Sequence, residues 1–327
     1  MQANMQNTRI PLLVGALAVS TTLVLAGCGG GDISSAPAAG GSAQTCSAPV
    51  NMAVNPWVGY EASAYVVGEV IKQKTGCQVE YKNLKEEVSW QGFGSSVDVV
   101  IEDWGHPDLE KKYVESASPT AVDAGPNGNV GQIGWYVPPW MAEKYPDVLQ
   151  YSNLNKYADM LKTTESGGQG QLLDGDPSYV TNDEALVKNL DLDYKVVYAG
   201  SEAALITAFK QAEEQKKPLL GYFYAPQWFL SEVKLAKVAL PPYTEGCDSD
   251  PQAVKCDYAE TQLKKVVAAK FASSGSPAYT VVKNFSWTND DQNVVARYIA
   301  EDKMDPTAAA DKWISANQAK VDAWLPK

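Results

Sequence analysis

Apolar and polar positions alternate in the first part of the folded chain in the order that a parallel sheet with crossover helices requires. Residues 50–54 alternate apolar and small side chains, which predicts a short buried strand. From Tyr60, apolar residues recur at helical spacing until Gly76, which predicts a helix that ends at this glycine. Further strands are predicted over 78–84 and 98–103. The order strand, helix, strand, short helix, strand indicates an α/β unit.

The middle of the chain repeats this pattern and predicts a second α/β unit. Thr181 with Glu184 has the spacing of a capping box, which predicts a helix start. Two apolar stretches that end in double prolines, 132–139 and 235–242, predict strands that cross between two lobes. The remaining expectations are strands over 171–173, 194–199 and 219–224, a turn over 125–129, and helices over 181–190, from 201, and over 258–271, 277–285, 290–299 and 306–325.

These patterns predict an α/β fold of two lobes, each a mostly parallel sheet flanked by helices, with the two crossing strands as the hinge. The first lobe is expected to comprise residues 46–137 together with 241–327. The second lobe is expected to comprise residues 138–240.

Aromatic residues follow the predicted strands at the edge where open α/β sheets bind ligands. Trp57 comes directly after the strand 50–54, Trp104 follows the strand 98–103, and the segment 222–228 places four more rings at the end of a later strand. Nine Trp and seventeen Tyr against six Phe favour rings with strong π faces. Such rings can stack on a sugar or hold a quaternary ammonium group, which cannot donate hydrogen bonds. We therefore expect an aromatic-lined site.

The chain offers little for catalysis. His106 is the single histidine, and no nucleophile motif lies beside it. Glu102 and Asp103 are neighbours on a predicted strand, so their side chains point to opposite faces and cannot share one scissile bond. The sequence contains no P-loop, no dinucleotide fingerprint and no HExxH motif. We expect a binding protein without enzymatic activity, cofactor or metal.

The N-terminus predicts export and a lipid anchor. An apolar run over 11–26 leads through small residues to Cys28, which resembles the lipobox of bacterial lipoproteins. We expect residues 1–27 to be a signal peptide, Cys28 to carry the lipid at the cell membrane, and 28–45 to be a flexible tether. Removing the signal peptide changes the formal charge from -12 to -13, because Arg9 is its only charged residue. So acidic a chain repels nucleic acid.

The four cysteines beyond Cys28 support an exported protein. Cys46 and Cys77 each precede a predicted strand and can meet at one sheet edge, whereas Cys247 and Cys256 bracket a turn-rich loop. We expect two disulfides, Cys46–Cys77 and Cys247–Cys256. Metal ligation is the competing interpretation, but no further thiol or imidazole lies nearby in the sequence to complete a zinc site.

Several of these motifs together resemble the glycine betaine and choline binding proteins of ABC importers, the OpuAC-like family. The resemblance covers most of the chain and depends on the order and spacing of its aromatic positions. The motifs that carry it are Pro56-Trp57 with Glu61-Ala62-Ser63, the strand 98–103 with Trp104, Ile133-Gly134 with Val137-Pro138, and Tyr224-Ala225-Pro226-Gln227-Trp228.

The resemblance implies a type II periplasmic-binding-protein-like fold with an aromatic cage between the lobes. Only one of Trp135 and Tyr136 can face the cleft, because neighbours on a strand point to opposite faces. Trp228 has the alternative of packing within the following helix. The implied ligand-binding residues are Trp57, Trp104, Trp135, Tyr136, Tyr179, Tyr224 and Trp228.

The implied function is that of an extracytoplasmic solute-binding lipoprotein that acts as a monomer. It would capture a quaternary ammonium osmolyte, with glycine betaine expected before choline or a related betaine, and deliver it to an ABC permease with its ATPase. The alternatives are binding of another small zwitterion or amino acid, a surface-anchored carbohydrate-active enzyme, and a non-catalytic adhesion module.

Overall fold

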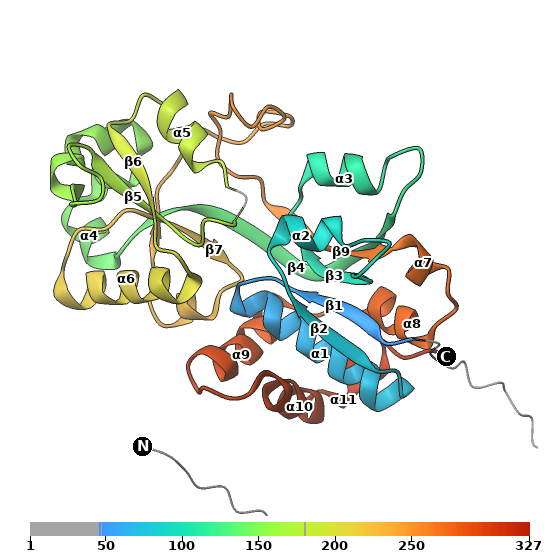
Figure 1. Ribbon diagram of the computed structural model, residues 1–327. Helices are drawn as coiled ribbons and strands as arrows, with labels where there is room; N and C mark the ends of the chain where they lie inside the picture. The colour runs from blue at the N-terminus through green and yellow to red at the C-terminus, as the bar shows by residue number, and fades with distance from the viewer. Residues whose placement is uncertain (1–45, 47, 180) are drawn as a thin grey trace, which may run out of the picture. The chain divides into compact units, whose positions relative to one another are not determined.

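The computed structural model describes residues 46, 48–179 and 181–327. The expected signal peptide and the whole expected tether, 28–45 with Cys28, lie outside these residues. The strands are β1 (Val50–Val54), β2 (Val79–Asn83), β3 (Val99–Asp103), β4 (Ala121–Val137), β5 (Gly170–Asp174), β6 (Tyr194–Tyr198), β7 (Gly221–Ala225), β8 (Ala236–Lys237) and β9 (Thr261–Ala268). Within the described residues they form one mixed sheet in the order β2-β1-β3-β9-β4-β7-β5-β6, with β8 beside β4 (Figure 1).

Helices flank this sheet. The α-helices are α1 (Val58–Thr75), α2 (Glu86–Gln91), α3 (Pro107–Tyr113), α4 (Pro139–Lys144), α5 (Asp183–Asn189), α6 (Glu202–Gln215), α7 (Ala269–Ala272), α8 (Pro277–Asn284), α9 (Asn289–Ala300), α10 (Pro306–Ala316) and α11 (Gln318–Asp322). The 3₁₀ helices are η1 (Pro146–Leu149), η2 (Tyr151–Tyr157), η3 (Asp159–Leu161) and η4 (Trp228–Ser231). The expected single helix over 306–325 is therefore two, with a break at Asn317.

The first α/β unit has the predicted order. β1 pairs in parallel with both β2 and β3, and α1 connects β1 to β2. Gly76 ends α1 in the left-handed conformation, with φ 73°, which a residue without a side chain adopts at little cost. α1 packs against α9 and α10, which lie beside it in Figure 1. The ends of β1 and β3 are thereby fixed next to one another.

The second α/β unit also has the predicted order. β5 pairs in parallel with β6 and β7, and Ser201 caps α6 by accepting a hydrogen bond from the Ala204 amide at 3.2 Å. The predicted capping box at Thr181 is wrong. The Thr181 hydroxyl donates instead to Asp174 at 3.1 Å, and α5 begins only at Asp183.

β4 is longer than the sequence predicted. The glycine-rich stretch 125–129 was expected to be a turn, but it lies within the strand, where the register to β9 shifts on both sides of Pro126. Such irregularities accommodate glycine and proline without ending the strand. The first part of β4 pairs with β9 and the last part with β7 and β8. One continuous strand therefore joins the two halves of the sheet.

The expected helix over 258–271 is also wrong, because most of it forms β9. This strand lies between β3 and β4 and is antiparallel to both. Its β-branched Val266 and Val267 are buried, as suits a central strand. The expected second crossing over 235–242 contains only β8, and the chain returns to the first half of the sheet through 241–260.

Two clusters of buried apolar side chains form the core. The larger contains the α1 side of the sheet and extends to β7, and the smaller contains Trp135, Leu172 and Val254. The structure places disulfides between Cys46 and Cys77 and between Cys247 and Cys256, the two pairs that the sequence analysis expected. Within the described residues, no helix is long and apolar enough to span a membrane, and no cluster of three or more candidate metal ligands occurs.

Candidate ligand-binding site

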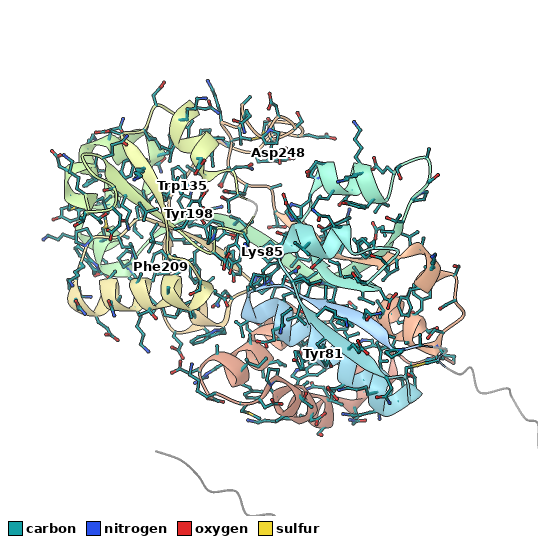
Figure 2. All side chains as sticks on the ribbon, viewed as in Figure 1. Tyr81, Lys85, Trp135, Tyr198, Phe209 and Asp248 are labelled. Atoms are coloured by element: carbon teal, nitrogen blue, oxygen red, sulfur yellow. A yellow bond between two sulfur atoms is a disulfide. The ribbon has the colours of Figure 1, made fainter. Side chains whose placement is uncertain are left out.

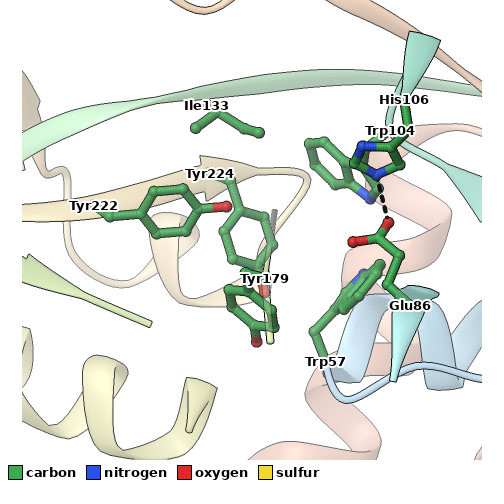
Figure 3. Close-up of a pocket in the computed structure, with 8 residues that line it drawn as sticks. All are labelled: Trp57, Glu86, Trp104, His106, Ile133, Tyr179, Tyr222 and Tyr224. Atoms are coloured by element: carbon green, nitrogen blue, oxygen red, sulfur yellow. Dashed lines mark hydrogen bonds and ion pairs between the residues drawn. The ribbon is translucent and has the colours of Figure 1, made fainter. Parts of the chain in front are cut away.

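Aromatic side chains from both halves of the sheet meet at one cavity (Figure 3). Its volume of about 30 Å³ has room for about two water molecules. Rings form most of its wall, and Glu86 with His106 forms a polar end. The residues that line it are Trp57, Glu86, Trp104, His106, Ile133, Tyr179, Tyr222 and Tyr224.

Trp57 and Trp104 form the first wall of the cavity, and one buried carboxylate, that of Glu102, binds both of them. Trp57 immediately precedes α1 and Trp104 follows β3, and each indole Nε1 donates to Glu102 Oε1 at 2.9 Å. The other carboxylate oxygen accepts from Ser63 at 3.1 Å and from the Gln292 side chain at 2.7 Å. The orientations of the two indoles are therefore set by the same group.

Glu102 is fully surrounded by protein. Burial raises its pKa, and the hydrogen bonds from Trp57, Trp104, Ser63 and Gln292 lower it. The two indoles and the Gln292 amide can only donate to it, whereas the Ser63 hydroxyl can also accept, because its own hydrogen can go to the Gly59 carbonyl at 3.1 Å. Burial is the larger effect, so the pKa of Glu102 lies above its ordinary value, although three of its four partners favour the ionised form.

Tyrosines form the second wall. Tyr222 and Tyr224 project from β7 on one face, and Tyr179 lies shortly before α5. The Tyr224 ring meets Trp104 edge to face, with centroids 5.5 Å apart and planes at 85°. The Tyr179 ring meets Trp57 in the same way, at 5.7 Å and 89°. Each tryptophan thus has a tyrosine partner from the other half of the sheet, in the arrangement that aromatic pairs prefer.

Glu202, the first residue of α6, connects the two walls. It accepts hydrogen bonds from the Tyr224 hydroxyl and, at 2.9 Å, from the Gln227 side chain. Its other oxygen accepts from the Val58 amide, the first of α1, at 2.8 Å. Burial raises the pKa of Glu202, and these three donors lower it. Burial is the larger effect and holds the pKa of Glu202 above its ordinary value. The Val58 amide and the Gln227 side chain, which can only donate here, favour the carboxylate, as does the positive end of the α1 dipole.

The polar end of the cavity is an ion pair. His106 Nε2 and Glu86 Oε1 are 2.7 Å apart, and both side chains are buried. Burial by itself would lower the pKa of His106. The negative charges of Glu86 and then Asp103 outweigh this effect and raise the pKa to about 9. The imidazole is therefore protonated at neutral pH and paired with Glu86. The second oxygen of Glu86 points toward the tyrosines in Figure 3.

A family model describing the substrate-binding domain of the ABC-type glycine betaine transport system matches residues 48–316. The chain belongs to this family. Its members are substrate-binding proteins of ABC transport and not enzymes, as the sequence analysis expected.

One curated relative and two solved structures show what this chain is similar to. A Listeria monocytogenes glycine betaine/carnitine transport binding protein is 28% identical over 137 residues, which is 42% of this chain and 41% of the relative. That match spans less than half of the curated relative. The structure of lactococcal OpuAC, closed and complexed with glycine betaine, has a TM-score of 0.67 at 23% identity, over 85% of this chain and 100% of the other. A choline binding protein in complex with choline has a TM-score of 0.68 at 17% identity, over 84% and 91%. These neighbours are two-lobed periplasmic binding proteins, which establishes the expected fold class.

Of the seven residues expected to bind ligand by analogy with this family, the cavity brings together Trp57, Trp104, Tyr179 and Tyr224. Trp135, Tyr136 and Trp228 lie elsewhere, and the physical reasons differ for each.

Trp135 shares a strand face with Ile133 but lies two residues farther from the cavity. Figure 2 labels Trp135 there, among the side chains of the second half of the sheet. It is fully buried, and its Nε1 donates to Asp183 at 2.8 Å. Tyr136 is on the opposite face and packs against Phe223, with centroids 6.3 Å apart. Trp228 begins η4 and packs against Phe229 in the core.

The sequence analysis missed six residues of the site: Glu86, His106, Ile133 and Tyr222, which line the cavity, and Glu102 and Glu202, which bind its rings. Tyr222 could have been found, because strand periodicity places it on the same face as Tyr224. Glu102 could have been recognised as a buried acid at the end of an apolar strand. Nothing in the local sequence distinguishes Glu86 from the exposed Glu87 beside it, or marks Glu202 at the start of its helix as a buried acid.

Proposed function

We propose that this protein captures a quaternary ammonium osmolyte of the glycine betaine and choline class in the aromatic cavity. The observation that carries the proposal is the meeting of five rings from both halves of the sheet: Trp57, Trp104, Tyr179, Tyr222 and Tyr224. A methylated ammonium group offers no hydrogen-bond donor, so ring faces are its natural binding partner. The relatives named for glycine betaine, carnitine and choline support the same ligand class.

The rings can supply much of the required affinity. Each cation–π contact contributes about 0.5 to 2 kcal/mol, and a micromolar complex needs roughly 8 kcal/mol. Three or four such contacts therefore provide a large part of the binding free energy. The polar end of the cavity provides the remainder through the tail of the ligand.

Binding is proposed to accompany closure of two lobes, residues 46–137 with 261–327 and residues 138–260, a division that differs from the expected one in giving 241–260 to the second lobe. Because the cavity holds only about two waters, the lobes must separate to admit an osmolyte. Val254 and Cys256 lie in the smaller core cluster with Trp135, so the excursion 241–260 is expected to move with the second lobe. The bond from the Val58 amide to Glu202 would form on closure.

The cellular role follows from the family and from the N-terminal sequence. We propose that the protein acts outside the cytoplasm as a monomer, attached to the cell membrane by a lipid on Cys28, and passes its ligand to an ABC permease with its ATPase. Mass spectrometry of the protein purified from membranes tests the anchor. A lipid-modified N-terminal Cys28 is expected, and a processed chain without lipid would contradict it.

Calorimetric titration of the purified protein with glycine betaine and with choline, monitored in parallel by tryptophan fluorescence, tests the binding function. Binding of at least one compound at micromolar concentration, with a change in emission, is expected because Trp57 and Trp104 line the cavity. If a folded sample binds neither of these compounds nor tetramethylammonium, the proposed function is wrong.

The alternative of a carbohydrate-active enzyme has no support in this cavity. Glycoside hydrolysis needs two carboxylates on one cleft. Among the described residues that line the cavity, only Glu86 carries a carboxylate, and it is paired with His106.

A further inference from the structure

We propose that this site selects its ligand by net charge: it favours a quaternary ammonium cation with an uncharged, hydroxyl-bearing tail over a betaine zwitterion, and Glu86 in its pair with His106 is the residue that decides. This inference rests on the proposed function, because it concerns the tail of the ligand whose head the rings hold. It reverses the order in which the sequence analysis placed glycine betaine and choline.

The cavity has few hydrogen-bond donors to offer a ligand. A carboxylate tail accepts only and needs several donors when it leaves water. The side chains of the cavity have few left, because their N–H and O–H groups already bind protein acceptors. Trp57 and Trp104 donate to Glu102, Tyr224 donates to Glu202, Tyr179 donates to the Pro56 carbonyl, and His106 is paired with Glu86.

Within the part of the chain that the structure describes, the side-chain groups of the cavity with no such partner are the Tyr222 hydroxyl and His106 Nδ1. Two donors are a poor replacement for the water around a carboxylate. A hydroxyl tail has a much smaller requirement, since it needs one acceptor. The second oxygen of Glu86, which points toward the tyrosines in Figure 3, is such an acceptor.

Acidic side chains outnumber basic ones around the cavity. Glu86 lines the cavity, Glu102 lies directly behind the two tryptophans, and Glu202 lies directly behind Tyr224. Against these three acidic side chains stands a single basic one, His106, which is paired with Glu86. No lysine or arginine is among the described lining residues. Coulomb interactions are strong in a site from which water is largely excluded, so this surplus of negative charge attracts a cation and repels a ligand carboxylate.

The hollow next to the cavity is also lined by more acidic than basic side chains. It has a volume of about 530 Å³ and adjoins the cavity at Trp57. Glu61, Asp176 and Glu202 line it together with a single cation, Lys85. A ligand that approaches from this side meets a net negative surface before it reaches the rings, which further favours a cation.

The decisive variant is Glu86→Gln, compared with Glu87→Gln as the matched control. Glu87 is the next residue of α2 but is exposed and does not line the cavity. The dissociation constants of choline, glycine betaine and tetramethylammonium are measured by calorimetry for each protein, and circular dichroism verifies folding.

The wild-type protein and the Glu87→Gln control are expected to bind choline at least tenfold more tightly than glycine betaine. Glu86→Gln removes the carboxylate that lines the cavity and offers an acceptor to a hydroxyl tail. We therefore expect choline to weaken about tenfold, while glycine betaine, whose own carboxylate is no longer repelled there, binds more tightly. A general loss of structure would weaken both ligands, and so cannot produce these opposite changes. If Glu86→Gln does not fold, His106→Gln decides, because removal of the cation should widen the preference for choline.

Two results would overturn the inference: a wild-type protein that binds glycine betaine as tightly as choline or more tightly, or a Glu86→Gln variant with an unchanged ratio of the two affinities. Either would leave the proposed function standing, because a quaternary ammonium compound still binds. The absence of binding to all three compounds would instead remove the proposed function itself.

Discussion

The two walls of the cavity are built on the same principle but fixed in different ways. On the first wall, the indoles of Trp57 and Trp104 donate to Glu102, whose other partners, Ser63 and Gln292, belong to the same half of the sheet. On the second wall, Tyr224 donates to Glu202. One carboxylate thus binds both indoles of the first wall, whereas on the second wall a carboxylate binds only one of the three tyrosines.

The difference lies in where the remaining bonds of the carboxylates go. All four donors to Glu102 come from its own half, so the first wall is complete without the second. Glu202 has a bond to the Val58 amide across the cavity, and Tyr179 donates to the Pro56 carbonyl on the same opposite side. We infer that the first wall is organised before closure, whereas the second reaches its final arrangement only when the lobes meet.

The largest effect is expected for Glu102→Gln. An amide offers one acceptor oxygen in place of two, and its NH₂ group would face donors, so both indoles lose their common anchor. Affinity for choline is expected to fall about 100-fold, and the free energy of unfolding by about 2 kcal/mol, since buried donors are left without acceptors. Calorimetry and urea unfolding measure the two quantities.

Glu80→Gln is the control for that variant, because Glu80 is exposed on β2, where it pairs only with Lys82. It should change neither affinity nor stability measurably. A Glu102→Gln variant that binds choline like wild type would show that the indoles are held by packing and not by the carboxylate.

Single ring deletions should have intermediate effects. Trp57→Ala and Trp104→Ala each remove a face of the cavity, and each is expected to weaken binding at least tenfold, or about 1.4 kcal/mol. Trp135→Phe is the comparison, because this buried tryptophan lies outside the cavity. It should lower stability through the lost bond to Asp183 but leave affinity within about twofold. If calorimetry shows a large loss of affinity in Trp135→Phe and none in Trp57→Ala or Trp104→Ala, the ligand does not bind in this cavity.

The residues of these predictions differ in how far the sequence reveals them. Trp57 and Trp104 were predictable because each follows a buried parallel strand, and the carboxyl ends of such strands converge on one edge. Tyr224 lies within β7, one residue before its end, and was expected from the family resemblance. The α/β units themselves were visible because strands and helices differ in their hydrophobic period.

Other features depend on contacts that local sequence does not encode. The segment that forms β9 could equally suit a helix, and only its position between β3 and β4 makes it a strand. Trp135 and Tyr136 could not be assigned, since their exposure depends on how far along β4 the cavity lies. Glu202 became important only because α6 begins beside the start of α1.

Glu202→Gln tests the bond between the walls. The glutamine oxygen still accepts, but the negative charge near the first amide of α1 is lost. We expect affinity to fall about fivefold, mainly through faster dissociation, because the bond belongs to the closed form. Stopped-flow fluorescence measures the two rates. Glu214→Gln, an exposed position on the same helix, should change neither rate, and a loss confined to the association rate would argue against a role in holding the closed form.

The smallest effect is expected for Tyr179→Phe, which keeps the ring against Trp57 and removes only the hydroxyl that donates to the Pro56 carbonyl at 3.2 Å. A partly exposed, neutral hydrogen bond contributes about 0.5 kcal/mol, so affinity should fall only about twofold. Tyr179→Ala removes the ring as well and should cost at least tenfold. Calorimetry on the pair separates the two contributions: a large loss in Tyr179→Phe would mean that the second wall acts through its hydroxyl contacts across the cavity, whereas a small one means that it acts through its ring faces, as the first wall does.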